Sequence, residues 1–145
     1  MTGTPLGAKQ HHPVPDSLKN YQSIVSIEFI EQNQKTDDVR SAAYRPVDGG
    51  AQTRIRLSIQ DELTDSDLNL DEANAYINAI VEAGIFDWDY SYRPAQGNFT
   101  NVNTQWRLKI EFDAATGQSP FISEGESFFP DNYDSIINLL LRINE

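Results

Sequence analysis

The stretch that decides the fold of this chain begins Trp106-Arg107-Leu108-Lys109-Ile110-Glu111-Phe112-Asp113 and continues to Ile143. Apolar and charged residues alternate through this opening segment without an exception. Because successive side chains of a strand point to opposite faces, the apolar residues share one face and the charged residues share the other. This pattern predicts a half-buried strand in an antiparallel sheet that has one face in water.

A short hairpin and a return strand are predicted next. The segment 114–117 suits a hairpin loop in which Gly117 takes the position with φ above zero. Phe121 and Ile122 can then pair back onto the first strand. Because Pro120 lacks an N–H group, we expect this return strand at an edge of the sheet.

The stretch ends in a predicted helix that starts near Asp131. Asp131 is the expected N-cap, and Asp134 lies near the positive end of the helix dipole. One face repeats at helical spacing and consists of Tyr133, Ile136, Ile137, Leu140 and Leu141. A helix of this kind, packed on a sheet face, closes a small core.

The pattern Trp-x-Leu-x-Ile-x-Phe from Trp106, a hairpin, and Gly-x-x-x-Phe-Pro-x-Asn-Tyr from Gly125 resemble the C-terminal part of a group of small bacterial domains. The resemblance covers 105–140, about a quarter of the chain. Glu126 and Phe128 depart from the small residue and the Asn of that group's turn. The resemblance implies the fold and carries no activity.

Upstream, strands are predicted at 21–30, 53–60 and 86–92 and a helix from Asn69 to Gly84. Glu72 follows Asn69 at the spacing of a capping box, and Gly84 suits the C′ position. We expect a long hairpin loop at 31–50 and an acidic connection at 61–68.

These elements predict an α+β fold. The expected order is β-β-α-β-β-β-α, with a mostly antiparallel sheet of about five strands and two helices packed on one face. Residues 20–145 are expected to form a single domain. Residues 1–19, with three prolines and little apolar content, are predicted to be a flexible tail.

Composition excludes several kinds of chemistry. The chain has 145 residues and no cysteine, which removes disulfides, thiolate nucleophiles and zinc–thiolate sites. No apolar run approaches the roughly 18 residues that cross a bilayer, and no secretory signal is recognised, so we expect a cytoplasmic protein without membrane contact. The formal charge of −11 argues against direct nucleic-acid binding through phosphates.

No motif predicts a catalytic, metal or cofactor site. Asp65-x-Asp67-x-Asn69 resembles the start of a calcium loop, but Leu70 replaces the required Gly and Tyr76 replaces the bidentate Glu. The only histidines, at 11–12, lie in the predicted tail, which argues against a Ser-His-Asp arrangement. Carboxylate pairs at 87/89 or 124/126 could serve acid–base chemistry if they were desolvated.

Charge distribution is the most informative feature. Nine acidic residues and no Lys or Arg lie between Leu57 and Tyr92, and six acidic residues and no Lys or Arg lie between Ile110 and Leu141. The predicted acidic binding surface is Asp61, Glu62, Asp65, Asp67, Asp71 and Glu72. Strand alternation places four basic residues on the face opposite the core, namely Arg54, Arg56, Arg107 and Lys109. If their strands are neighbours, this face carries a basic patch.

Three functions follow from these patterns. The main hypothesis is a non-enzymatic interaction protein whose acidic surface binds a basic macromolecular partner, as an inhibitor or a nucleic-acid mimic. The alternative is a ligand-binding module that uses the basic sheet face and the aromatic residues Trp88, Tyr90 and Tyr92. A carboxylate-dependent enzyme is the third hypothesis. Against the two binding hypotheses, pairing with Glu28, Glu111, Asp87 or Asp89 could neutralise the basic patch and leave the acidic helices as a solvated surface.

Overall fold

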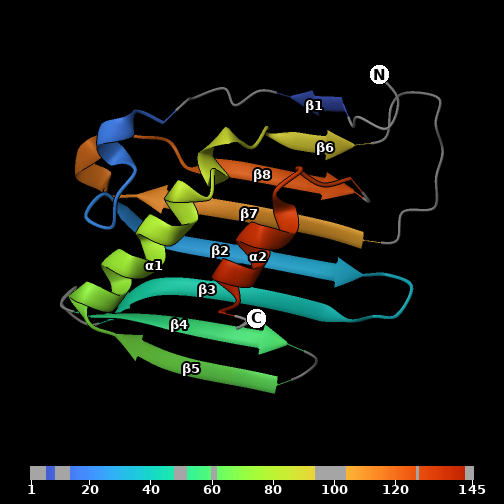
Figure 1. The fold of residues 1–145 in the computed structure, drawn as a ribbon, viewed down its shortest axis with the longest axis horizontal. Coiled ribbons are helices and arrows are strands. Elements are labelled where there is room, and N and C mark those ends of the chain that lie inside the picture. The colour runs from blue at the N-terminus through green and yellow to red at the C-terminus, as the bar shows by residue number, and fades with distance from the viewer. Residues whose placement is uncertain are drawn as a thin grey trace.

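The computed structural model describes residues 6–8, 14–47, 52–59, 62–93, 104–126 and 128–142. Within these ranges, eight strands form one sheet and two α-helices lie on one of its faces (Figure 1). The strands are β1 Leu6–Ala8, β2 Ile24–Asn33, β3 Val39–Val47, β4 Gln52–Ile59, β5 Glu62–Leu68, β6 Ser91–Arg93, β7 Thr104–Phe112 and β8 Phe121–Glu126. The helices are α1 Leu70–Glu82 and α2 Tyr133–Leu140. The predicted α+β class is confirmed.

The sheet has the order β1-β6-β8-β7-β2-β3-β4-β5. All neighbouring strands are antiparallel except β6 and β8, which are parallel. The sheet therefore has more strands than the five expected from the sequence. The strands that the pattern does not predict are β1, β3 and β5.

β3 and the end of β2 together occupy most of the long loop predicted at 31–50, so that prediction is wrong. Ala42 and Tyr44 are buried on the helix side of β3, and Ser41 and Ala43 lie on its other side. Small and polar residues weaken the alternation by which a strand is recognised, and Pro46 near the end of β3 is a further signal against one.

β5 replaces the predicted acidic connection before α1. It is the last strand of the sheet and pairs only with β4 among the described residues. Of its side chains only Leu68 is buried. An edge strand tolerates polar and charged residues, so its sequence carries almost no hydrophobic signal.

The strand predicted at 86–92 is mostly absent. A 3-10 turn covers Ile85–Asp87, and only the short β6 follows. Trp88 and Tyr92 are nevertheless buried, as an inward-facing alternation requires. The turn and the irregular segment thus bury two of the four aromatic rings of the predicted strand, and Phe86 and Tyr90 stay partly exposed.

Two details of the C-terminal stretch also differ. β8 lies between β7 and β6 rather than at an edge, because Pro120 precedes the strand and leaves the ladder intact. Asn132, not Asp131, is the N-cap of α2, and its side chain makes no capping bond. The buried face of α2, the capping box of α1 and the positive φ of Gly84 and Gly117 are confirmed.

The core lies between the helices and the sheet, and its centre is aromatic. The ring of Trp106 packs edge-on against Trp88 at 5.4 Å and lies 5.2 Å from Tyr133. Its Nε1 donates to the carbonyl of Phe128 at 2.9 Å. Asn132 accepts from Trp88 Nε1 at 2.7 Å, which ties the start of α2 to the segment after α1.

Part of the predicted tail is described. β1 pairs with β6, and a 3-10 turn covers Asp16–Leu18. Val14 and Leu18 pack against the core. Residues 1–5 and 9–13, including both histidines, lie outside the described residues.

Candidate functional site

Two surfaces carry the charged residues that the sequence singles out. The first is the helix layer, which we define as residues 69–90 and 128–142. The second is the open sheet face, which we define as the side chains of β2–β5, β7 and β8 that point away from the helices. Figure 1 shows both helices on the same side of the sheet, so no helix of the described residues lies over the open sheet face.

Two of the predicted acidic residues lie on the open sheet face rather than beside the helices. Asp67 accepts from Arg54 Nε at 2.8 Å, and Asp65 accepts from Arg56 Nε at 2.9 Å and from Nη2 at 3.2 Å. The hydrogen bond from Arg56 holds the pKa of Asp65 below its usual value. These carboxylates therefore neutralise the arginines of the adjacent strand.

The other predicted acidic residues lie in different parts of the chain. Asp71 and Glu72 are exposed in the first turn of α1, and Glu72 also accepts from the backbone N–H of Asn69 at 3.0 Å. Glu62 is exposed at the start of β5, and Asp61 lies outside the described residues. The six residues thus do not share one face.

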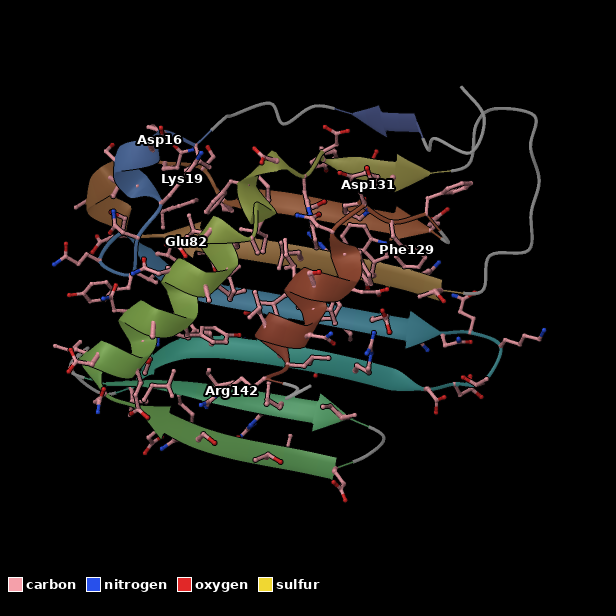
Figure 2. All side chains as sticks on the ribbon, viewed as in Figure 1. Asp16, Lys19, Glu82, Phe129, Asp131 and Arg142 are labelled. Atoms are coloured by element: carbon pink, nitrogen blue, oxygen red, sulfur yellow. The ribbon has the colours of Figure 1, made fainter. Side chains whose placement is uncertain are left out.

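Most of the acidic excess of the described chain lies in the helix layer. Its charged residues are Asp71, Glu72, Glu82, Asp87, Asp89, Asp131, Asp134 and a single base, Arg142. All of these carboxylates except Asp89 belong to exposed residues. Figure 2 shows Glu82 on α1 and Asp131 before α2, on the helix side of the sheet.

The open sheet face is close to neutral. Its described bases are Arg45, Arg54, Arg56, Arg107 and Lys109, and its described acids are Glu28, Asp65, Asp67, Glu111, Glu124 and Glu126. Each of these bases has a carboxylate oxygen within 4.0 Å. Alternating charges across neighbouring strands produce this balance.

The four predicted bases do not form one patch. Two belong to β4 and two to β7, and β2 and β3 separate those strands. The condition under which the sequence predicts a continuous basic patch is therefore not met. Of the proposed neutralising residues, Glu28 binds Arg45 at 2.6 Å and Glu111 lies 4.0 Å from Lys109.

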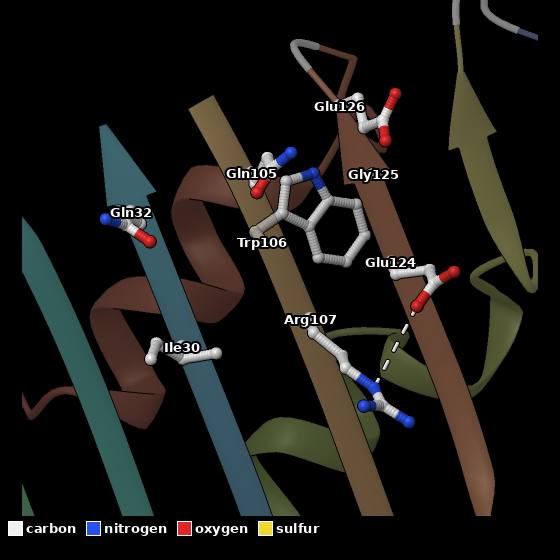
Figure 3. A pocket seen from close by; sticks show the side chains of 8 residues that line it. All are labelled: Ile30, Gln32, Gln105, Trp106, Arg107, Glu124, Gly125 and Glu126. Carbon is white, nitrogen blue, oxygen red and sulfur yellow. Dashed lines mark ion pairs between the residues drawn. The ribbon is translucent and has the colours of Figure 1, made fainter. Parts of the chain in front are cut away.

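Two shallow hollows lie on the open sheet face. The first has a volume of about 280 Å³ and is lined by Gln32, Gln105 and Glu126, among others (Figure 3). The second has a volume of about 360 Å³ and lies over β7, β2 and β3. Ile30 and Arg107 line both hollows, so the two adjoin.

The predicted aromatic residues lie on the opposite side of the sheet. Trp88 and Tyr92 are buried, and Tyr90 is partly exposed. The hydroxyl of Tyr92 accepts from the backbone N–H of Asp89 at 2.8 Å, and burial raises its pKa. Two of these three rings therefore present almost no surface to a ligand.

A charged cluster lies beneath α2, and no pattern in the sequence indicates it. Glu31 accepts from Arg40 Nε at 2.8 Å and Nη2 at 2.9 Å, and from the hydroxyl of Tyr133 at 2.5 Å. The Glu31 side chain is only 15% exposed. Burial raises the pKa of Tyr133, and the hydrogen bond to Glu31 raises the pKa of Arg40. Since its partners satisfy the carboxylate, we assign this cluster to holding α2 on β2 and β3.

Within the described ranges, no three or more His, Cys, Asp or Glu side chains are grouped so as to hold a metal ion. In the same part of the chain, neither helix is long and apolar enough to cross a membrane. The chain matches no protein-family model, no curated protein and no solved structure.

Proposed function

We propose that the protein is a non-enzymatic interaction protein whose helix layer docks a basic macromolecular partner. The observation that carries this proposal is the segregation of charge. The helix layer holds seven carboxylates and one guanidinium, whereas acids and bases alternate on the open sheet face. A field of one sign on one side of a molecule attracts and orients an oppositely charged partner.

The partner surface must carry several Lys or Arg side chains. A single exposed ion pair contributes about 0.2–1 kcal/mol, so affinity has to come from several of them. A protein with a basic groove for nucleic acid has such a surface, and carboxylates of the helix layer would lie where phosphates otherwise bind. Inhibition of such a protein is the biological role that this charge arrangement supports best.

The variants that test the proposal must spare the acids that have structural roles. Asp65 and Asp67 bind arginines, and Glu72 closes the capping box. Asp71 and Glu82 are exposed at opposite ends of α1 and take no part in those contacts. We therefore define Asp71→Asn with Glu82→Gln as the helix-layer variant.

A matched control removes two carboxylates elsewhere. Asp37 and Asp38 are exposed in the turn between β2 and β3, outside the helix layer. Asp37 has φ 62°, a conformation that Asn tolerates. The turn variant, Asp37→Asn with Asp38→Asn, thus changes the net charge equally.

The test is a titration of each protein with a lysine-rich peptide at low salt. We expect the helix-layer variant to bind the peptide about three- to tenfold more weakly than the wild type, because two exposed charge pairs are lost. The turn variant should bind within about twofold of the wild type. Equal weakening in both variants would mean that the peptide senses only net charge, and the helix layer would not be the docking surface.

A further inference from the structure

The hollow over β7, β2 and β3 is unusual in this acidic chain because its lining is net cationic. Arg45, Arg107 and Lys109 line it, and among the described residues Glu28 is the one acid that does. The adjoining hollow has one base, Arg107, against two acids. The hollow beside the Glu31–Arg40 cluster has one base against three acids.

The register of the strands explains the shape of this hollow. On β3, Ser41 lies opposite Ile30, and Ala43 lies opposite Glu28. Because these side chains are small, the surface over β3 is depressed relative to the long side chains of β7. There, Arg107 lies opposite Ile30 and Lys109 lies opposite Glu28.

Two of the three cations that line the hollow, Arg107 and Lys109, are only loosely paired. Arg107 Nε lies 3.9 Å from a Glu124 oxygen, and Lys109 Nζ lies 4.0 Å from a Glu111 oxygen. These distances exceed those of a charge-assisted hydrogen bond, which is about 2.7–2.9 Å. The donors of both cations can therefore turn toward an incoming anion at small cost, since exposed pairs of this kind contribute little.

Glu28 is the carboxylate that lines this hollow. It binds Arg45 at 2.6 Å and lies directly across from Lys109. Beside it, Ile30 is 48% exposed, an unusual position for an apolar side chain of this size in the middle of a sheet face. The hollow thus combines cationic donors with an apolar surface on one side.

We propose that this hollow binds a small organic anion, one that joins a carboxylate, sulfonate or phosphate-ester group to an apolar body. Arg107 and Lys109 hold the charged group, and Ile30 supports the apolar body. The volume of about 360 Å³ lies near the lower end of the range for small-molecule sites, which favours a small ligand. Because the site lies on the face opposite the helix layer, it does not depend on the proposed docking function.

The probe is anilinonaphthalene sulfonate, whose fluorescence rises in an apolar site, and phenylnaphthylamine is its uncharged counterpart. We expect the sulfonate to bind to one site per chain and more tightly than the amine. Arg107→Gln and Lys109→Gln should each weaken sulfonate binding about tenfold, because each removes a hydrogen bond to a charged group. Neither change should alter binding of the amine by more than about twofold.

Two further variants test the direction and the position of the charge effect. Glu28→Gln should tighten sulfonate binding about fivefold, since it removes a like charge a few ångströms from the ligand. Lys35→Gln is the matched control, because Lys35 is exposed in the turn after β2 and does not line the hollow. The control should leave binding unchanged although it removes the same charge as Lys109→Gln.

Urea unfolding of each variant first establishes that the fold is intact, as expected for substitutions at partly exposed surface positions. The proposal is overturned if the sulfonate does not bind at concentrations up to about 1 mM. It is also overturned if the amine binds as tightly as the sulfonate, or if Lys35→Gln weakens binding as much as Lys109→Gln. Weaker binding to Glu28→Gln would contradict the assignment of Glu28 as the competing carboxylate.

Discussion

Of the glycines Gly84, Gly117 and Gly125, Gly125 leaves the least room for an added methyl group. A Cβ at this position would lie 2.6 Å from the carbonyl oxygen of Phe128 and 2.6 Å from Cε2 of Trp106, and it would also overlap Nε1 of that indole. The first obstacle is backbone and the second is a buried ring, so neither can move aside freely. The φ of Gly125 is not positive, so the effect is steric rather than conformational.

The cost of Gly125→Ala follows from what must shift. Overpacking of a core costs about 1–3 kcal/mol. Moving the indole of Trp106 also breaks its hydrogen bond to Phe128, and a buried donor left without a partner costs about 1–3 kcal/mol. Replacing Gly by Ala returns about 0.4–1 kcal/mol by restricting the unfolded chain. We therefore expect a loss of about 2–4 kcal/mol in the free energy of unfolding.

Urea unfolding followed by tryptophan fluorescence measures this loss directly. Gly117→Ala is the matched control, because a Cβ at Gly117 meets nothing within 4 Å although its φ is 70°. The control should cost about 1–2 kcal/mol from the left-handed backbone alone. In a Trp106→Phe background the smaller ring leaves room, so the cost of Gly125→Ala should fall. Equal stability of Gly125→Ala and the wild type would refute the close packing of Trp106 over β8.

Three other changes test the contacts that hold α2 in place. Asn132→Ala should lower the free energy of unfolding by about 1–3 kcal/mol, because the buried indole N–H of Trp88 loses its acceptor; a change below about 0.5 kcal/mol in urea unfolding would contradict this. Arg40→Met should cost about 2–3 kcal/mol by leaving the mostly buried carboxylate of Glu31 without its cation, and adding Glu31→Gln should restore part of the loss. The raised pKa of Tyr133 means that its neutral form stabilises the fold, so the contribution of Tyr133 to stability should be constant up to a pH of about 10 and fall above it; above this pH, unfolding midpoints should fall less steeply in Tyr133→Phe.

The elements with complete local patterns were predictable. The capping box at Asn69 and Glu72 and the glycine at Gly84 define both ends of α1, because each depends on residues close in sequence. The alternation in β7 and the apolar face of α2 are also local signals, and burial follows both. Propensity and periodicity decide these segments without help from distant contacts.

The strands that were missed depend on their neighbours. β3 lies between β2 and β4, so pairing on both sides stabilises a sequence with small and polar residues. β5 lies at an edge, where charged residues are tolerated and only Leu68 reaches the core. The residues of β3 or β5 alone do not indicate which strands these segments pair with.

The candidate surface was only partly predictable for the same reason. The sequence gives the number of carboxylates but not the face on which each one lies. Asp65 and Asp67 precede α1 by a few residues, yet the register of β5 on β4 sets them against Arg56 and Arg54. The acidic surface therefore lies on the exposed side of α1 and at the start of α2, rather than on all six residues predicted from the sequence.

The central claim, that the helix layer docks a basic partner, is tested most directly by affinity capture from the lysate of the source cell. Wild type, the helix-layer variant and the turn variant are compared at about 50 mM and about 500 mM salt, and the captured proteins are identified by mass spectrometry. We predict a basic protein that wild type and the turn variant retain at low salt, that the helix-layer variant retains poorly, and that high salt releases from all three. Equal retention by the helix-layer variant, or no basic protein captured at either salt, would contradict the claim.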